Sequence, residues 1–286
     1  MDNPDRQPKV SVVITAYNAE RYIRASVSAA LAQTYPNFEV VVVDDGSFDQ
    51  TGEICAAVDD ARFRYLQRGR LGRGRALNEG VSAATGDYIA INDADDLSLP
   101  LRLEYSMSFA RRHPDLAFLG TEYVTTNVFH EHIPRELLST SGEAVPDRIG
   151  WLSPMTVYRR NVFVNSTLFY PKSTWRRIGG YDERLPLSED YDFQLRALQY
   201  GKAVILPRRT VLWYTNPGSY FKQKSRREQV ETLKLVRRRA HRLLNLPLWL
   251  RLYHPLWVAA SGCTHAFPSL LTVVNAVRGV IRALIH

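Results

Sequence analysis

The chain has 286 residues, of which 45% are hydrophobic and 23% are charged. This is the composition of an ordinary folded protein, and it excludes a disordered or fibrous one. The length allows one large domain or two small ones. The two cysteines, Cys55 and Cys263, are far apart and lack metal-type spacing, which argues against a disulfide framework and favours a reducing compartment.

Neither a signal segment nor a membrane-spanning helix is evident in the sequence. Residues 1–9 are mostly polar, and no run reaches the roughly 18 to 20 apolar residues that cross a bilayer. We therefore expect a cytoplasmic protein, with the inner face of the cell membrane as an alternative location.

The net charge of +8 is unevenly distributed. Basic residues collect after Lys222, at Lys224, Arg226, Arg227, Arg237, Arg238, Arg239 and Arg242. Such a concentration favours an acidic partner, which could be anionic lipid, nucleic acid or a phosphorylated substrate.

The first hundred residues alternate between short apolar runs and helical patterns. Strands are predicted at residues 10–14, 38–43, 63–66 and 88–91. The helix between the first two has a buried face formed by Ile23, Val27 and Leu31, and further helices are predicted at residues 51–58 and 72–84. This alternation is typical of a doubly wound, Rossmann-like α/β sheet, and unbroken apolar strands are typical of parallel pairing with both faces covered.

Polar residues follow three of these strands. They are Thr15-Ala16-Tyr17-Asn18, Asp44-Asp45-Gly46-Ser47 and Asn92-Asp93-Ala94-Asp95-Asp96. Ligands of such sheets bind at the carboxyl ends of the strands, so the three clusters are expected to meet at one edge. This convergence favours a ligand site over scattered surface turns.

The third cluster places Asp93, Asp95 and Asp96 directly after a buried strand. Close carboxylates repel one another and raise one another's pKa, so such a cluster is tolerated where a cation binds. Mg²⁺ and Mn²⁺ suit hard oxygen ligands, and Mg²⁺ is usually held by one or two carboxylates together with substrate phosphates. The alternative is an acidic turn that caps the next helix, in which Pro100 suits the first turn.

The second half of the chain is less regular. Helices are predicted at residues 101–113, 173–178 and 188–200, and strands at residues 117–123, 204–206 and 211–214. Residues 125–150 are polar and are expected to form a long loop or lid, whereas residues 162–170 are expected to be extended. His130-Glu131-His132 lies in that loop, and without a third ligand in view a lid is favoured over a metal site.

Two amphipathic helical patterns follow residue 215. In the first, Val230, Leu233, Val236, Ala240 and Leu243 lie at helical spacing. In the second, Leu270, Val273, Val274, Val277, Ile281 and Leu284 form the apolar face, and Arg278 and Arg282 lie opposite. Basic helices of this kind can lie on an anionic membrane. We favour packing of the apolar faces on the rest of the chain or on a second subunit, because such faces are most often core.

Four motifs, taken in order, give the chain a specific resemblance. They are residues 10–18 (VSVVITAYN), residues 42–47 (VVDDGS), residues 92–96 with Pro100 and Arg102 behind them, and Gly179-Gly180-Tyr181-Asp182-Glu183 followed by Glu189-Asp190. Together they resemble the family-2 glycosyltransferases, which have a GT-A fold. The resemblance covers residues 10–215 and does not include the C-terminal region.

The resemblance implies a GT-A sheet in which residues 1–100 form the nucleotide-sugar-binding half and residues 101–215 the acceptor-binding half, followed by a basic helical region at residues 216–286. It implies inverting transfer of a sugar from a nucleoside-diphosphate sugar, of the UDP or dTDP type, to a hydroxyl of a glycan or lipid-linked acceptor, as in polysaccharide biosynthesis for the cell envelope. Mn²⁺ or Mg²⁺ would be the cofactor. A homodimer and peripheral contact with an anionic membrane are compatible with this view, and nucleic acid is not an expected partner.

The resemblance also implies roles for individual residues. The implied donor-binding residues are Thr15, Ala16, Tyr17, Asn18, Asp45, Arg73, Asn78, Asp93 and Ala94. Among them, Asp45 would accept a hydrogen bond from the base and Asp93 would lie near the ribose. Asp95 would hold the metal, and Asp190 would be the catalytic base.

One position departs from the family pattern. Many relatives carry an arginine directly before the position of Asn78, where this chain has Leu77. Arg68, Arg70, Arg73 and Arg75 lie just upstream, and one of them is a candidate for the phosphate contact.

The proposed chemistry needs one metal and one base. A metal stabilises the charge that develops on a departing diphosphate, and a carboxylate that accepts the proton of the attacking hydroxyl typically contributes about 10²- to 10⁴-fold. A helix dipole would keep Asp190 ionised but would lower its basicity. The alternative for Glu189 and Asp190 is simple helix capping. Asp192 is the rival base, but two residues further along a helix it should point elsewhere.

Glu189, Asn165, Trp151 and Tyr181 are the candidates for the acceptor side. Asn165 begins a glycosylation pattern that we expect to be idle without a secretory signal. Aromatic residues could stack on sugar rings, although core packing is their commoner use.

Two other functions compete with glycosyl transfer. A nucleotidyltransferase acting on sugar phosphates would usually have a Gly-rich, basic loop after the first strand, which this chain lacks. The hypothesis of a basic nucleic-acid- or membrane-binding protein is supported by the charge alone.

Overall fold

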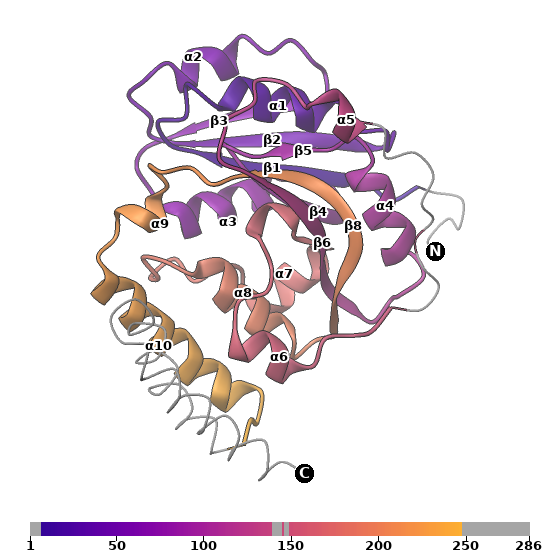
Figure 1. The fold of residues 1–286 in the computed structure, drawn as a ribbon, viewed down its shortest axis with the longest axis vertical. Helices are drawn as coiled ribbons and strands as arrows, with labels where there is room; N and C mark the ends of the chain where they lie inside the picture. Colours follow the sequence, from indigo (N-terminus) through magenta and orange to yellow (C-terminus); the bar gives the residue numbers. More distant parts are fainter. Residues whose placement is uncertain (1–6, 139–144, 146–148, 248–286) are drawn as a thin grey trace.

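The computed structural model describes residues 7–138, 145 and 149–247, which form one curled eight-stranded sheet with helices on both faces (Figure 1). The strand order is β3-β2-β1-β4-β7-β6-β8-β5. The strands are β1 (Val10–Ala16), β2 (Phe38–Asp45), β3 (Phe63–Arg68), β4 (Tyr88–Asp93), β5 (Leu97–Ser98), β6 (Leu116–Thr126), β7 (Phe169–Pro171) and β8 (Lys202–Tyr214). This mixed, mostly parallel sheet confirms the α/β prediction.

Two layers of helices bury the sheet. The helices are α1 (Ile23–Leu31), α2 (Thr51–Ala56), α3 (Arg73–Ala83), α4 (Arg102–Ala110), α5 (Arg135–Leu138), α6 (Pro154–Arg159), α7 (Lys172–Ile178), α8 (Glu189–Ala197), α9 (Tyr220–Gln223) and α10 (Arg226–Leu243), with a 3-10 helix η1 (Asn165–Thr167). Val12 and Ile14 belong to the core beneath α1 and α4, and Val13 belongs to the core beneath α3 and α8. The apolar run of β1 is therefore buried on both faces, as predicted.

The parallel pairing of β1 with β2 and β4 positions the polar clusters. The register pairs Ala16 with Asp44 and Thr15 with Asp93. Because these residues end their strands, all three clusters lie at the same edge of the sheet, which confirms the prediction.

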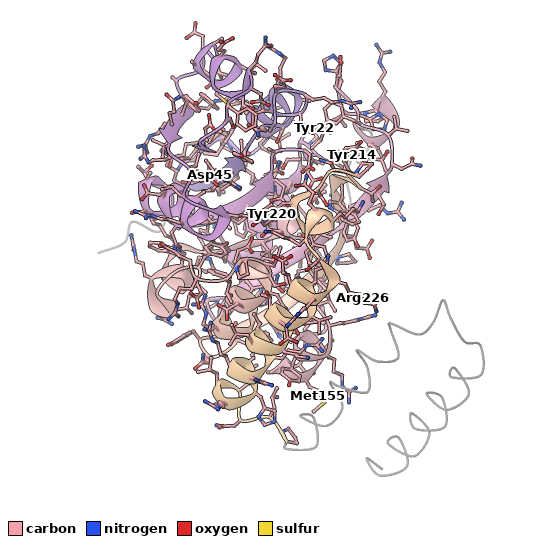
Figure 2. All side chains as sticks on the ribbon, turned by 90° about the vertical axis from the view of Figure 1, so that its left-hand side faces the viewer. Tyr22, Asp45, Met155, Tyr214, Tyr220 and Arg226 are labelled. Carbon is pink, nitrogen blue, oxygen red and sulfur yellow. The ribbon has the colours of Figure 1, made fainter. Side chains whose placement is uncertain are left out.

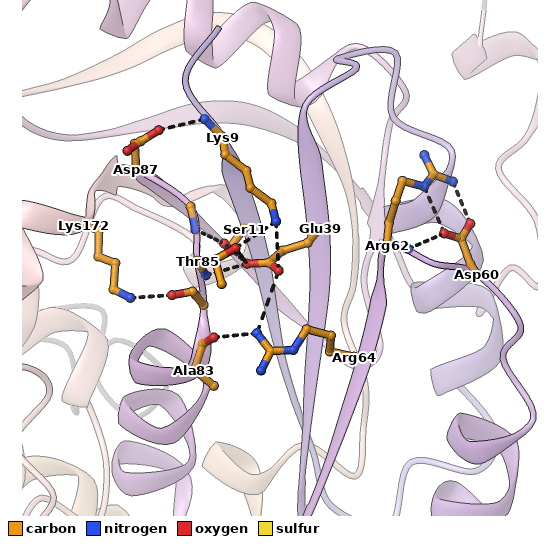
Figure 3. A network of polar contacts seen from close by, with 12 residues as sticks. Lys9, Ser11, Glu39, Asp60, Arg62, Arg64, Ala83, Thr85, Asp87 and Lys172 are labelled. Atoms are coloured by element: carbon orange, nitrogen blue, oxygen red, sulfur yellow. Dashed lines mark hydrogen bonds and ion pairs between the residues drawn. The ribbon is translucent and has the colours of Figure 1, made fainter. Parts of the chain in front are cut away.

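At the amino ends of β1 and β2, opposite the polar clusters, a polar network surrounds Glu39 (Figure 3). The buried Glu39 carboxylate accepts hydrogen bonds from Ser11 Oγ at 2.6 Å, from the Thr85 backbone amide at 2.6 Å and from Lys9 Nζ at 3.2 Å. Burial opposes the charge of this carboxylate, but the hydrogen bonds hold the pKa of Glu39 below its usual value. Polar groups at this edge thus pair with one another.

The second half of the sheet differs from the prediction in three places. Residues 204–206 and 211–214, expected as two strands, belong to the single strand β8, whose pairing with β6 contains register shifts. Residues 162–170 are not uniformly extended, since η1 interrupts them; the Thr167 hydroxyl donates to the Val164 carbonyl at 2.7 Å, a local bond that favours a turn. The short strand β5 was not predicted.

The first amphipathic helix of the C-terminal region, α10, packs on the sheet domain (Figure 1). Val236 and Ala240 are buried in the core that includes α8. Arg239 Nη1 lies 2.5 Å from Asp182, and Arg237 Nη2 donates to the Arg159 carbonyl at 2.6 Å. The favoured alternative, packing on the rest of the chain, is confirmed for this helix. The second pattern, at residues 270–285, lies outside the described residues.

The helices within the described part of the chain are too short or too polar to cross a membrane. The longest of them, α10, carries many charged side chains.

A buried arginine, Arg102, connects the end of β4 to the segment before β7. Its Nη2 donates to the Ile91 carbonyl at 2.6 Å and to the Leu168 carbonyl at 3.3 Å. Its Nη1 donates to Ser98 Oγ at 2.7 Å and to Asn92 Oδ1 at 3.2 Å. One side chain therefore ties together three segments that surround the acidic cluster.

Replacing Arg102 with methionine should destabilise the fold. Each buried oxygen left without its donor costs about 1–3 kcal/mol, so we expect the variant to lose at least about 3 kcal/mol in the free energy of unfolding measured with urea. Arg24→Met, at an exposed position on α1, is the matched control and should change stability by less than about 0.5 kcal/mol. Equal stability of both variants would contradict the connecting role of Arg102.

Candidate functional site

The loops after β1 and β2 present Tyr17 and Asp45 at the edge of the sheet. Asn18, at a φ of +49°, accepts a hydrogen bond from the Phe48 amide at 3.1 Å and so joins the two loops. The Tyr17 ring is 41% exposed and contacts Phe48 edge-on at 6.1 Å between centroids. Asp45 is only 3% exposed. Figure 2 looks onto the side of the molecule where Asp45 lies.

Asp44 and Asp45 differ in their surroundings although they are neighbours. Asp44 accepts hydrogen bonds from the Ser47 amide at 2.9 Å and from the Tyr65 hydroxyl at 2.9 Å, which shapes the loop itself. Asp45 instead accepts the amides of Leu71 at 2.5 Å and Gly72 at 3.1 Å and forms an ion pair with Arg70. Asp45 therefore draws the β3–α3 loop, residues 69–72, to the end of β2.

The acidic cluster after β4 divides into a buried part and a part that borders the site. Asp96 is buried, accepting from the Ser166 hydroxyl and from the Tyr214 amide. Asp93 and Asp95 are half-buried, with Ala94 between them. Asp95 accepts a hydrogen bond from Asn216 at 2.9 Å. Asp93 and Asp95 thus border the site, whereas Asp96 is enclosed by the protein.

The electrostatic environment of the acidic cluster favours a bound cation. Burial and the neighbouring charge of Asp93 raise the pKa of Asp95, and burial and the charge of Asp95 raise the pKa of Asp96 well above its usual value. In the described part of the chain, no three His, Cys, Asp or Glu side chains gather closely enough to hold a metal. An ion that is held by one or two carboxylates and completes its shell with phosphate oxygens, as Mg²⁺ usually does, would not need such a group.

Arg73 links the two acidic parts of the site. As the first residue of α3 it follows Gly72, whose φ of +89° turns the chain into the helix. Arg73 Nη2 lies 2.6 Å from Asp93 Oδ1, and Arg73 Nε lies 2.8 Å from Glu189 Oε1. Burial disfavours the charge of Arg73, but the carboxylates of Asp93, Glu189 and Asp190 outweigh it and raise its pKa.

Asp190 lies in the first turn of α8, after Ser188 at a φ of +59°. Burial raises the pKa of Asp190 and of Glu189, and the charge of Arg73 opposes the rise. Asn161 donates a hydrogen bond to Asp190 Oδ2 at 3.3 Å. Asp192 instead forms an ion pair with Arg196 at 2.6 Å, so its carboxylate is directed along α8, as the helical spacing predicted.

The contacts form a continuous chain across the site. Asp45 holds the loop that leads into Arg73, Arg73 contacts Asp93 and Glu189, and Asp190 follows Glu189. Asn165 adds a hydrogen bond of 2.9 Å to Asp93. Asp45, Asp93 and Asp190 therefore lie around one site and not around separate ones.

Other predicted site residues have structural partners. Asn78 accepts from the Tyr181 amide at 2.8 Å and from Trp175 Nε1 at 3.0 Å, and it donates to the Tyr181 carbonyl at 2.9 Å; its predicted contact with the donor stays a prediction. The Tyr181 ring is buried against Phe193. In this position it supports the start of α8 from within the core.

Trp151 lies away from the acidic cluster. Its ring packs against Phe109 and His113 and lies 5.2 Å from Lys202 Nζ, at the start of β8. Asp96 contacts Tyr214, at the end of the same strand. A strand rises about 3.3 Å per residue, so Trp151 and the cluster lie at opposite ends of β8. In this structure Trp151 packs against other rings away from the acidic cluster, and its acceptor-side role stays a prediction.

Sequence reasoning missed several residues of the site. Asn216 follows the end of β8, which is also the end of the strand predicted at residues 211–214, so the same strand-end rule could have found it. Ser166 was considered only as part of a glycosylation pattern, and Asn161 carries no signal in the sequence. Arg70 was noted among the upstream arginines, but its contact with Asp45 depends on the course of the β3–α3 loop.

Comparison with known proteins identifies the family. The model of the family described as glycosyl transferase family 2 matches residues 11–177, more than half of the chain. The putative glycosyltransferase EpsE of Bacillus subtilis (strain 168) is 32% identical over 247 residues, which are 84% of each protein. The glycosyltransferase GlyG of Streptococcus pneumoniae serotype 4 is 46% identical over 91 residues, 31% of this chain and 30% of GlyG.

Solved structures share the fold. S. aureus TarS 1-349, in complex with UDP-GlcNAc, matches with a TM-score of 0.63 and 21% identity over 80% of this chain and 65% of TarS 1-349, so the chain spans less than two thirds of that protein. The mannosyltransferase PcManGT from Pyrobaculum calidifontis, in complex with GDP-Man and Mn²⁺, matches with a TM-score of 0.66 and 20% identity over 99% of this chain and 81% of PcManGT. The chain therefore belongs to glycosyl transferase family 2 and is a glycosyltransferase with a GT-A fold.

Proposed function

We propose that this glycosyltransferase moves a sugar from a nucleoside-diphosphate donor, held with a divalent cation, to the hydroxyl of a glycan or lipid-linked acceptor, with inversion at the anomeric carbon. The observation that carries the proposal is the pair of contacts from Arg73 to Asp93 and to Glu189. The Arg73 guanidinium thus contacts both Asp93, a proposed donor-binding residue, and Glu189, which precedes the proposed base Asp190. Such an arrangement suits a reaction in which the leaving group and the attacking hydroxyl meet at one carbon.

The donor side suits a nucleotide. Tyr17 offers an exposed ring on which a base can stack, and Asp45 offers an acceptor for a base N–H group. Thr15 and Ala16 border this position, and Asp93 would accept a ribose hydroxyl. The complexes of TarS and PcManGT contain UDP-GlcNAc and GDP-Man, which supports a nucleoside-diphosphate sugar here, and we favour the UDP or dTDP type.

Asp95 would hold the cation, together with oxygens of the diphosphate. A bound Mn²⁺ or Mg²⁺ supplies stabilisation of the charge that develops on the departing diphosphate. The raised pKa of Asp95 supports this assignment, because a cation relieves the repulsion between Asp93 and Asp95. The PcManGT complex contains Mn²⁺, which supports the use of a divalent cation here.

Asp190 would accept the proton of the attacking hydroxyl. Burial raises its pKa, which makes its carboxylate a stronger base than an exposed aspartate. With one carboxylate as the base and the diphosphate as the leaving group, direct displacement inverts the anomeric carbon. Glu189, engaged by Arg73, would position this carboxylate and not exchange protons itself.

The metal and base roles can be separated by substitution. Asp95→Ala and Asp190→Ala should both reduce sugar transfer to the limit of detection. Only Asp95→Ala should weaken the binding of nucleotide sugar measured by calorimetry with Mn²⁺, because Asp190 faces the acceptor hydroxyl in this proposal. Asp59→Ala, at an exposed position between α2 and β3, is the control. An equal loss of donor binding in both variants would refute the division of roles.

The hydrogen bond from Asn161 should set the pH range in which Asp190 acts as the base. Asn161 stabilises the ionised form of Asp190 and lowers its pKa, so Asn161→Ala should raise that pKa. The base works when ionised; the acid limb of the kcat/KM profile should therefore move to higher pH, while the rate at high pH stays near that of the wild type. Thermal melting checks that the variant is folded. An acid limb that stays in place, or moves to lower pH, would argue against Asp190 as the base.

We further propose that the exposed basic side of α9 and α10 contacts an anionic membrane. Residues 220–243 contain nine lysines and arginines and two glutamates, a net +7 of the chain's +8. Arg226 and Arg227 are exposed, and the neighbouring Tyr220 and Phe221 are 39% and 51% exposed. Exposed aromatic and basic side chains together are typical of segments that bind membrane surfaces.

Vesicle sedimentation tests this membrane contact. A polybasic segment gains about 1 kcal/mol per charge near an anionic surface, so reversing both Arg226 and Arg227 to glutamate should weaken binding to phosphatidylglycerol-containing vesicles at least about tenfold. The same reversal at Arg21 and Arg24, which are exposed near the start of α1, provides the charge-matched control. Equal binding of the two double variants would show that α10 does not direct the contact.

A further inference from the structure

Arg70 occupies the space beside the two residues that are expected to hold the base. Its guanidinium carbon lies 3.5 Å from the centroid of the Tyr17 ring. Its Nη1 forms an ion pair with Asp45 Oδ2. We call this space, over the Tyr17 ring and beside Asp45, the base slot.

The contacts of Arg70 have the same chemistry as the contacts of a bound base. A guanidinium is planar, stacks on aromatic rings and carries N–H donors at its edge. A uracil, thymine or guanine ring is also planar and carries an edge N–H group that a carboxylate can accept. Because the guanidinium already lies at stacking distance from Tyr17, Arg70 and a base cannot occupy the slot together.

We propose that Arg70 is an internal occupant of the base slot, which the donor must displace before its base can stack on Tyr17 and pair with Asp45. This inference depends on the proposed function, because it takes Tyr17 and Asp45 as the base-binding residues. Without a donor, Arg70 pairs with the buried Asp45 carboxylate, and a buried charge without a partner is costly.

The side chain of Arg70 can leave while the loop backbone stays. The amides of Leu71 and Gly72 donate to Asp45 Oδ1 at 2.5 and 3.1 Å, so the backbone remains attached when Oδ2 loses its arginine. The loop also lies tightly against Gly46, at a φ of +79°, where a Cβ atom would come within 2.8 Å of the Arg70 amide nitrogen. By contrast, the Arg70 side chain is 44% exposed.

Because each nucleotide must first displace Arg70, the presence of Arg70 lowers the affinity of every nucleotide by the same factor. The fraction of molecules with an empty slot multiplies each intrinsic affinity equally, so Arg70 sets the donor concentration that is needed and does not choose among bases. The choice among bases remains with Asp45, whose carboxylate accepts an N–H group and repels a ring-nitrogen acceptor.

Calorimetry with UDP and GDP in the presence of Mg²⁺ tests the proposal on the full chain. Arg70→Ala should bind whichever of these nucleotides binds the wild type about three- to tenfold more tightly, since it removes a competing stacked cation. Arg70→Lys keeps the charge but lacks the planar fork, so its affinity should lie between those of the wild type and Arg70→Ala.

Arg68→Ala is the matched control for the loss of a positive charge. Arg68 is near the start of the same loop and forms an ion pair with Glu79 at 3.3 Å. Loss of a positive charge alone should weaken binding of a diphosphate slightly. Tighter binding in Arg70→Ala together with unchanged or weaker binding in Arg68→Ala would support displacement.

The other outcomes overturn the proposal in distinguishable ways. Unchanged binding in Arg70→Ala would show that Arg70 does not compete, and weaker binding than in Arg68→Ala would show that it contacts the bound nucleotide; in both cases the proposed function would stand. Failure of UDP and GDP to bind the wild type and Arg70→Ala would refute the base slot itself, and with it the UDP-type donor of the proposed function.

Discussion

The site depends on the neutralisation of carboxylates that would otherwise repel one another. Asp93 and Asp95 follow one strand, and Glu189 and Asp190 begin a helix more than 90 residues later. Charges that are partly removed from water are poorly screened, so these segments could not pack together without a cation between them. Arg73 provides that cation by contacting both segments. The acidic character of the site and its assembly from distant parts of the chain therefore have the same physical origin.

A buried polar network holds the site carboxylates in place. In each of the two acidic pairs, one carboxylate stabilises the local backbone and the other borders the site. Asp44 stabilises its own loop, whereas Asp45 faces the β3–α3 loop. Asp96 is held by Ser166 and Tyr214, whereas Asp95 is half-buried. Networks whose members are all hydrogen-bonded are rigid. Each acidic pair thus combines one carboxylate that fixes the backbone with one that borders the candidate site.

The sequence predicted the parts of the fold that depend on local pattern. Apolar runs and helical spacing identified β1 to β4 and α1 to α3, and the strand-end rule brought their polar clusters to one edge. The sequence did not predict features that depend on contacts between residues far apart in the chain. Residues 204–206 and 211–214 were predicted as two separate strands, but register shifts against β6 accommodate the irregularity in one strand. The contacts of Asn161 with Asp190 and of Asn216 with Asp95 join residues 29 and 121 positions apart, and nothing local specifies them.

Arg70 and Arg73 belong to one short loop and helix start, yet their partners constrain them differently. Arg73 contacts carboxylates from two segments that are fixed by the core, so moving it would leave both without a cation. Arg70 contacts one exposed ring and a carboxylate that the loop amides also hold, so its departure leaves the backbone contacts intact. An incoming ligand most readily displaces the side chain whose departure destabilises the rest of the site least. On this argument, donor binding would replace Arg70 and act alongside Arg73, which keeps the acidic halves of the site together while the donor enters.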